Sequence, residues 1–508
     1  MENDRGLFVR GSTGLVREAG FVDAVSVNVA NMSVGAALGT VGFTLAALPT
    51  VSGVNLIAAS IIAFTLSIPQ IITYTTLTRH IPRTGGDYVW LTRAFGPKLA
   101  WLVFGLALGF VIESLVYYSL IAIAGVDQLS LVLPLLGINV SINPMESIIL
   151  SIVLFAIIVA VNIMGTKYGI RLMTGLTVFS ILSLVLSFLV LFLTPRAKII
   201  EAVSGLLPNG YTYSKVASQY TGPYFALGPT IMMLPFFAIY IYPWLNAGPA
   251  MSSEIKGRRA VGLNVPTAAL LTMLLATIGF TAMYYALGFN FVTAALSNSN
   301  INGTVNYWTI AMAASGNPIL AWIIGIGSVT WNLAILAYGA IIVVRYWFAM
   351  SFDRVLPSFF AYLSPRFGSP VYAHLFDLAI TSILITLAGV FYGTFTALYG
   401  AVVEALLYYM AVGIAAVVIG VKGAGIIGLR NPSRVTLAIS GMLFAAVMGF
   451  LTYQFLEYPS IWGGNWLAYG VEAAAVIVGI VLYVTVRLLH KRRLGIDIAA
   501  TYMEIPPE

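Results

Sequence analysis

The stretch FFAIYIYPWLNAGPAMSSEIK, Phe236–Lys256, lies within a hydrophobic run that is long enough to cross a bilayer. Two prolines interrupt it, Pro243 near its middle and Pro249 farther along. Proline has no N–H, and its ring clashes with the carbonyl group four residues earlier, so a helix kinks or breaks there. In lipid, the freed backbone groups are tolerated only where they face protein or a water-filled cavity. Transporters use such broken helices as binding sites, whereas a kinked packing helix is the simpler alternative.

The composition of the whole chain indicates a membrane protein with many spans. Of its 508 residues, 60% are hydrophobic and 8% are charged, and the mean hydropathy is +0.95. Soluble proteins contain about 25% charged residues. Cysteine is absent, which excludes disulfides, thiol catalysis and cysteine-based metal sites. The N-terminal segment contains Arg5, Arg10 and Arg17 but no apolar core, so no cleaved signal peptide is expected.

Runs of about 20 apolar residues predict twelve transmembrane helices. Their expected ranges are 22–49, 54–78, 98–125, 146–164, 170–194, 226–252, 262–288, 318–350, 372–391, 394–421, 434–455 and 467–489. If the N-terminus is cytoplasmic, the segments on that side hold 22 of the 25 lysine and arginine residues, and Arg196, Lys198 and Lys215 lie outside. This asymmetry follows the positive-inside rule and places both termini in the cytoplasm. It also accounts for the net charge of +7 without a nucleic-acid partner.

Small and polar residues replace leucine at the centre of the first span, 22–49. Gly35 and Gly39 form a small-xxx-small pair, which lets another helix approach closely. The first and sixth spans, both interrupted, stand at corresponding positions five helices apart. That arrangement is typical of an inverted-repeat transporter with its binding site at the bilayer midplane. The residues at which the first span is expected to unwind are Met32, Ser33, Val34 and Gly35.

The segment after the second span resembles a known family. Residues 81–101, IPRTGGDYVWLTRAFGPKLAW, resemble the cytoplasmic signature of the amino acid–polyamine–organocation (APC) superfamily. Residues 162–172 resemble that family's entry into helix 5, and residues 252–260 its Glu-x-Lys stretch after helix 6. Residues 345–371 resemble its Arg…Ala…Asp-x-x-Leu-Pro stretch after helix 8. The four segments occur in the family's order, and the resemblance covers roughly residues 20–425.

The resemblance implies an all-α polytopic membrane protein with a five-plus-five inverted repeat, the fold often called LeuT-like. Helices 1 and 6 would be unwound at the substrate site, and helices 11 and 12 would lie outside the repeat. The implied divisions are a cytoplasmic N-terminal segment 1–21, a ten-helix transport core 22–425, two accessory helices 426–489 and a cytoplasmic tail 490–508. Residues 81–97 are interpreted as gating or structural rather than substrate-binding.

In this family, exposed backbone at the two breaks holds the substrate's carboxylate and amino groups, and an aromatic residue of helix 6 acts as a lid. Alignment back from Lys256 places the second unwound stretch at Ile241–Asn246. Here Tyr-Pro-Trp stands where many members have a small or glycine-containing run, so no specificity is carried over. Beside the four residues of the first span, the predicted substrate-binding residues are Tyr240, Ile241, Tyr242, Trp244 and Asn246.

Two carboxylates lie near the middle of predicted spans, Glu113 in the third and Glu404 in the tenth. A charge at that depth costs about 2.5–3.5 kcal/mol, so each group needs a partner, a cavity or a proton. We interpret both as functional, with a buried structural hydrogen bond or ion pair as the alternative. Asp377 and Glu472 lie nearer the ends of their spans and are interpreted as structural.

The sequence leaves two candidates for the coupling ion, Na⁺ and H⁺, and no other cofactor or metal is expected. Some proton-coupled members of the family hold a lysine in helix 5, but the corresponding position here falls at or near Ser180. Hydroxyl and carbonyl oxygens suit Na⁺, although serine and threonine also join helices with no ion present. The alternative is a proton on Glu113 or Glu404. Further candidate oxygen ligands for Na⁺ are Ser183, Ser328, Thr330 and Asn332.

The sequence therefore predicts a secondary active transporter of amino acids in the cell membrane, with small-molecule substrate and lipid as its partners. Transport of polyamines or other cationic amines is one alternative, and an amino-acid sensor that does not transport is another. A membrane enzyme would need a convergent histidine, cysteine or carboxylate constellation, which the sequence does not show. A channel would need a repeated filter or a charged ring, and none is visible.

Overall fold

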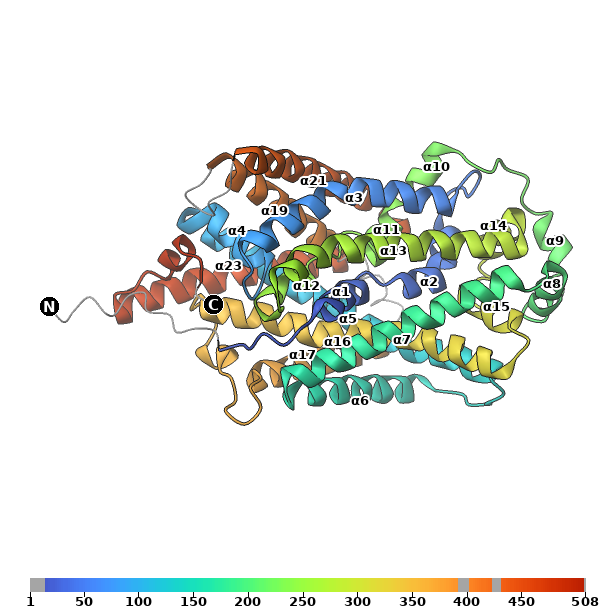
Figure 1. Cartoon of the computed structure of the whole chain (residues 1–508), viewed down its shortest axis with the longest axis horizontal. Helices are drawn as coiled ribbons and strands as arrows, with labels where there is room; N and C mark the ends of the chain where they lie inside the picture. Colours follow the sequence, from blue (N-terminus) through green and yellow to red (C-terminus); the bar gives the residue numbers. More distant parts are fainter. Residues whose placement is uncertain (1–13, 392–401, 423–430, 507–508) are drawn as a thin grey trace.

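Long helices run side by side along one axis of the molecule (Figure 1). The computed structural model describes residues 14–391, 402–422 and 431–506. Within these residues, eleven helical spans are long and apolar enough to cross a membrane, which confirms the prediction of an all-α polytopic membrane protein. They are α1 (Phe21–Asn31) with α2 (Val34–Ala47), α3 (Leu56–His80), α5 (Ala100–Leu135), α6 (Pro144–Ile163), α7 (Thr166–Leu193), α13 (Arg258–Leu287), α16 (Pro318–Phe352), α17 (Val371–Val390), α19 (Val402–Lys422), α21 (Asn431–Glu457) and α23 (Trp466–Leu494).

The remaining predicted span, the sixth at residues 226–252, is not one continuous helix. It consists of α10 (Leu227–Ile231), α11 (Leu234–Tyr240) and α12 (Ala247–Ala250). The gap between α11 and α12 contains Pro243, as expected of a residue that cannot continue the helical hydrogen-bond ladder. The first eight residues of the predicted tenth span, 394–401, lie outside the described residues.

Shorter helices lie at the two ends of the long axis (Figure 1). The end that carries α4 (Asp87–Phe95) is called the α4 end below, and the end that carries α8 (Arg196–Ser204) and α9 (Tyr213–Ala217) is called the α9 end. Other short helices are η1 (Gly96–Lys98), η2 (Ser252–Glu254), α14 (Phe289–Ser297), α15 (Tyr307–Ala314), η3 (Ser358–Ala361), α22 (Pro459–Trp462) and η5 (Ile498–Met503).

Burial separates inner helices from outer ones. The most apolar stretch of α5 is 89% buried inside the protein, whereas that of α23 is 22% buried. The α5 helix therefore forms the centre of the bundle, packed by α16, α17, α19 and α23. Leucine, isoleucine and valine cover the exposed faces of the outer helices, for example at Val153, Leu189, Ile383 and Val481. Such an apolar surface is suited to contact with the hydrocarbon core of a bilayer.

Two buried ion pairs connect the family-like segments at the α4 end. Both oxygens of Asp353 accept from Arg93, at 2.8 and 2.9 Å. Both oxygens of Glu254 accept from Arg345, at 2.9 and 2.7 Å. These four side chains are at most 2% exposed. Segments 81–101, 252–260 and 345–371, far apart in the sequence, are thus joined by bidentate contacts, the strongest geometry for such pairs.

The C-terminal tail packs on the segment that carries α4. The hydroxyl groups of Tyr502 and Tyr88 lie 3.1 Å apart, and both rings are buried. Arg93 donates to the carbonyl of Glu504 at 2.8 Å, and Arg83 donates to the carbonyl of Pro506 at 2.6 Å. The tail is therefore part of the folded molecule as far as the described residues extend.

A glycine turn brings the same segment against the broken helix. Gly85 and Gly86 have φ angles of +86° and +43°, which residues with side chains rarely adopt, as expected for a tight turn. The N–H of Gly85 donates to the carbonyl of Ala250 at 2.9 Å. A Cβ at Gly86 would lie 2.7 Å from the carbonyl carbon of Pro249. Only glycine allows the backbone of this turn to approach α12 so closely.

Candidate functional site

The bundle contains the two predicted helix breaks. The stretch Ile241–Asn246 lies between α11 and α12, where the sixth span was expected to unwind. In the first span, only Met32 and Ser33 lie between α1 and α2, so the expected unwinding at Val34 and Gly35 is wrong. The N–H of Ala37 already donates to the carbonyl of Ser33 at 3.1 Å, which starts the second helix directly after the break.

Asparagine side chains join the two breaks. Asn31, at the end of α1, donates to Oδ1 of Asn246 at 2.9 Å. The hydroxyl of Tyr409 on α19 donates to the same oxygen at 2.9 Å. Asn246 in turn donates through Nδ2 to the hydroxyl of Tyr346 on α16, also at 2.9 Å. Oδ1 of Asn31 is buried and has no hydrogen-bond partner among the described residues, so this site retains a free acceptor.

Trp244 covers backbone carbonyls that the second break would otherwise leave bare. Its indole Nε1–H points to the carbonyls of Ala238 and Ile239, both at 2.9 Å. Its ring stacks on Tyr117 of α5, with the ring centroids 5.8 Å apart. The indole therefore occupies the position at which the resemblance predicts the contacts of an ammonium group.

Two cavities lie near the breaks. A cavity of about 580 Å³ extends toward the α9 end and is walled by α2, α5, α11, α22 and the loop before α15. Thr40, Asp127, Gln128 and Tyr240 are among its lining residues. A second cavity, of about 10 Å³, lies at the Asn31–Asn246 contact. Its lining residues are Asn31, Phe110, Ser114, Tyr118, Trp244, Asn246, Tyr338, Ile342, Val343 and Tyr346.

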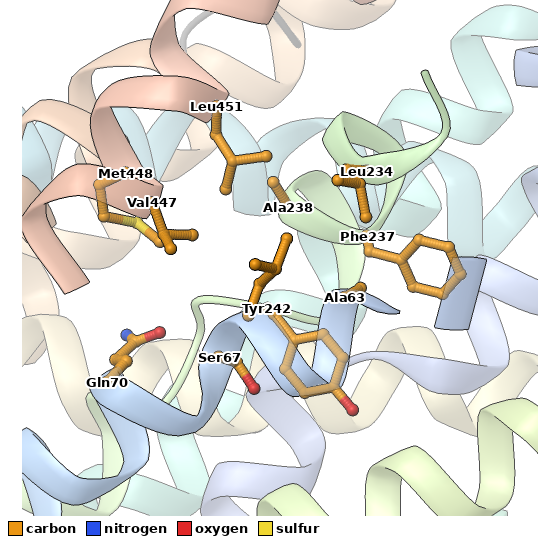
Figure 2. Close-up of a pocket in the computed structure, with 11 residues that line it drawn as sticks. Ala63, Ser67, Gln70, Leu234, Phe237, Ala238, Tyr242, Val447, Met448 and Leu451 are labelled. Atoms are coloured by element: carbon orange, nitrogen blue, oxygen red, sulfur yellow. The ribbon is translucent and has the colours of Figure 1, made fainter. Parts of the chain in front are cut away.

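Tyr242 points away from both of these cavities. Its ring lines a third cavity, of about 20 Å³, between α3, α11 and α21 (Figure 2). Ser67 and Gln70 of α3 line the same cavity, and Gln70 donates to the carbonyl of Pro243 at 2.6 Å. The structure thus places Tyr242 behind the break, on the side of α21.

The other predicted residues of the breaks lie in the protein interior. Met32, Ser33, Val34 and Ile241 are fully buried and belong to none of the three cavity walls described. The hydroxyl oxygen of Ser33 has no hydrogen-bond partner among the described residues.

Gly35 is enclosed by two tryptophans. Its carbonyl accepts from Trp308 Nε1 at 2.9 Å, and a Cβ at this position would lie 2.1 Å from Cδ1 of Trp331. The small-residue pair predicted at Gly35 and Gly39 thus faces aromatic side chains, because Trp308 lies against Gly39 as well.

Three buried carboxylates converge between α5, α19 and α23. Glu113 and Glu404, predicted from the sequence, are within electrostatic reach of each other, and Glu472 is within reach of both. Oε1 of Glu404 and both carboxyl oxygens of Glu472 have no hydrogen-bond partner among the described residues. Gly109, one turn before Glu113, makes room for Glu404, since a Cβ there would lie 2.6 Å from Oε1. The position of Glu472 near the end of its predicted span gave no indication that it lies close to Glu113 and Glu404.

The hydroxyl candidates for a cation site bond to protein groups. Oγ of Ser180 lies 2.8 Å from Oγ1 of Thr330. Ser328, two residues before Thr330 on α16, accepts from Gln128 Nε2 at 3.1 Å. Ser183 donates to a backbone carbonyl of α16 at 3.0 Å. The structure therefore brings Ser180 to Thr330 and turns Ser328 toward α5.

Sequence reasoning missed several polar side chains that the fold gathers near the breaks. Asp87 lies in a segment interpreted as a loop, and Tyr346 and Tyr409 lie in helices that read as apolar runs. All three are buried and hydrogen-bonded. A hydroxyl group inside a transmembrane run is the only signal that marks the two tyrosines, because such a group must find a partner away from lipid.

The comparison with known proteins agrees with this architecture. A curated relative, "Uncharacterized protein 399" of Sulfolobus islandicus rod-shaped virus 1, is 30% identical over 99 residues. The match covers 20% of this chain and 24% of that relative, and the relative's name states no activity. The family model described as "Amino acid permease" matches residues 26–482, which is most of the chain. The protein is therefore a member of the amino acid permease family.

Proposed function

We propose that the protein is a secondary active transporter that moves amino acids across the cell membrane by alternating access around its two broken helices. The observation that carries the proposal is the Asn31–Asn246 contact, which joins the two breaks beside a small cavity. A much larger cavity approaches this contact from the α9 end, while buried ion pairs hold the α4 end together. In alternating access, each state of the transporter opens the binding site to one side of the membrane and closes it to the other. The large cavity and the ion-paired end fit such a state.

The positive-inside rule gives this state an orientation. The segments at the α4 end carry most of the basic residues, so we assign that end and both termini to the cytoplasm. The large cavity then faces the outside, and the state is outward-facing. The five-plus-five repeat belongs to the same proposal, because each break lies in the first helix of one half.

The chemistry around the breaks suits an amino acid. The N-terminal end of α2, directly after Ser33, presents N–H groups without intrahelical partners and favours a carboxylate. Carbonyls of α11 and the rings of Trp244 and Tyr118 suit an ammonium group. Trp244 would then act as the lid, because its indole must leave those carbonyls before a substrate amine can reach them.

Uptake into proteoliposomes tests the proposal. A panel of labelled amino acids and polyamines is offered with no gradient, with a Na⁺ gradient or with a pH gradient. We expect accumulation of an amino acid, driven by one of the gradients or by exchange with preloaded substrate. Measurable binding without any uptake would contradict transport and identify a sensor.

A cationic amine is the second candidate substrate. Asp127 is a carboxylate that lines the large cavity, and it would attract a cation that enters from outside. The same panel separates the candidates, since polyamine uptake that amino acids do not inhibit would favour the amine.

The carboxylate cluster supports the proton as coupling ion, because buried carboxyl groups without partners are neutral only when protonated. We expect Glu404→Gln to abolish accumulation driven by a pH gradient and to leave exchange of internal for external substrate within about twofold of the parental rate. Glutamine has the shape of the protonated acid but cannot release the proton. The exposed Glu201→Gln is the matched control. Unchanged proton-driven accumulation in Glu404→Gln would show that another group carries the proton, whereas accumulation by the parent that only a Na⁺ gradient drives would favour Na⁺ at Ser180 and Ser328.

A further inference from the structure

The carboxylate of Asp87 is surrounded by tyrosine hydroxyls from three different spans. Oδ2 accepts from Tyr74 of α3 at 2.8 Å. Oδ1 accepts from Tyr346 of α16 at 2.6 Å and from Tyr408 of α19 at 3.0 Å. Asp87 and these three tyrosines are at most 1% exposed. A single side chain from a loop-borne helix therefore ties together three spans at the α4 end.

The same network reaches the candidate substrate site. Tyr346 donates to Asp87 and also accepts from Asn246, the residue that bridges the two helix breaks. Two hydrogen bonds thus connect the Asp87 carboxylate to the Asn31–Asn246 contact. The backbone supports this route, because the turn before Asp87 bonds to Ala250 of α12. Beside it, the hydroxyl oxygens of Thr84 and Ser253 lie 2.6 Å apart.

The charge state of Asp87 fits its role as an acceptor. Burial raises the pKa of its carboxyl group to about 6, and the three hydroxyl donors oppose that rise. At a pH of about 7 the carboxylate therefore predominates, and an ionised carboxylate accepts hydrogen bonds but donates none. It also lies at the first residue of α4, where the helix dipole favours a negative charge.

We propose that Asp87 is a positioning residue that holds the cytoplasmic end of the transport path closed through Tyr74, Tyr346 and Tyr408, and that Tyr346 connects this closure to Asn246 at the substrate site. The inference rests on the alternating-access function proposed above. A path that opens between α12 and α16 must separate Asn246 from Tyr346. That separation allows the Tyr346 hydroxyl to reorient and weakens its hydrogen bond to Asp87. Binding of substrate at the helix breaks and closure of the cytoplasmic end therefore change together.

The absence of cysteine makes the test direct, because any introduced thiol is the only one in the chain. Ser253→Cys places a reporter beside Thr84 at the α4 end, where Ser253 is 8% exposed. Thr40→Cys places a second reporter in the wall of the large cavity. In proteoliposomes, the rate of labelling by a membrane-impermeant maleimide is measured for each reporter from its own side of the membrane.

We expect Asp87→Ala and Tyr346→Phe to speed labelling of the Ser253→Cys reporter about tenfold and to slow labelling of the Thr40→Cys reporter. Each substitution removes two or three buried hydrogen bonds of the closed cytoplasmic end, which is enough for a change of that size. A merely destabilised protein would expose both reporters, so the opposite directions distinguish a gate from a loss of structure. Asp87→Asn, which keeps one acceptor oxygen, should give an intermediate rate.

Matched controls come from the same chain. Asp377→Asn changes another buried aspartate, and Tyr483→Phe removes a buried hydroxyl that has no hydrogen-bond partner among the described residues. Both should label at the parental rates. If Tyr346→Phe is folded and both reporters label as in the parent, the proposal is overturned, even where Asp87→Ala fails to fold. Labelling requires no knowledge of the substrate, so its outcome is independent of whether amino-acid uptake is found.

Discussion

Glu254→Gln is expected to lower the free energy of unfolding by about 3–5 kcal/mol, the largest stability effect of any single change considered for this protein. Glu254 and Arg345 are 0% and 1% exposed, and each oxygen of Glu254 accepts one guanidinium hydrogen bond. A glutamine removes the negative charge and leaves the arginine charged in a dry interior. The measurement is thermal unfolding in detergent, together with the fraction of monodisperse protein after purification.

The double variant Glu254→Met, Arg345→Met is the control for this expectation. Replacing both partners of a buried ion pair by apolar side chains is often neutral for stability. The double variant should therefore unfold close to the parental temperature. If the single and double variants are equally unstable, the loss arises from packing rather than from an unpaired charge.

Gly35→Leu is expected to reduce transport more than tenfold, and Gly35→Ala to reduce it by a smaller factor. A Cβ at Gly35 would lie 2.1 Å from the ring of Trp331, which is itself fully buried. The tryptophan cannot move aside without disturbing the contact between α2 and α16, directly after the first break. Overpacking of this kind typically costs about 1–3 kcal/mol and shifts neighbouring backbone.

Initial rates of uptake and surface expression measure this effect. Gly175→Leu is the matched control, because a Cβ at Gly175 in α7 has no heavy atom within 4 Å. It should insert and transport as the parent does. Parental transport by Gly35→Leu would show that the first break tolerates a large side chain, and it would remove Gly35 from the site.

The sequence was informative where one local cause decides the structure. Pro243 predicted an interruption of the sixth span, because the missing N–H and the clash of its ring depend on backbone sterics alone. The bounds of that interruption, Ile241–Asn246, were implied by the family resemblance. The predicted break in the first span began at the correct residue, Met32, but was two residues too long. No proline marks the end of that break in the sequence. The second helix begins at Val34, because the N–H of Ala37, its fourth residue, already bonds to the carbonyl of Ser33.

The polar network could not be predicted, because it depends on which helices meet. In the sequence, Asp87 is 259 positions from Tyr346 and 321 positions from Tyr408. Hydrophobic periodicity gives no information about contacts between residues so far apart in the chain. The convergence of Glu472 with Glu113 was missed for the same reason. The resemblance implied two accessory helices over residues 426–489, and it gave no indication that the second of them, α23, packs along the central α5.

The seating of the tail on the α4 segment has a consequence for biosynthesis. Tyr502 follows its partner Tyr88 by 414 residues, so the ribosome adds that many amino acids before the contact can form. At about 5–20 residues per second, this takes about 20–80 s. During that time Arg93 also lacks the carbonyl of Glu504. A helix bundle inserted in order along the chain thus completes one of its earliest loops only when one of its latest segments emerges, and nascent chains should remain dependent on chaperones or the insertion machinery until then.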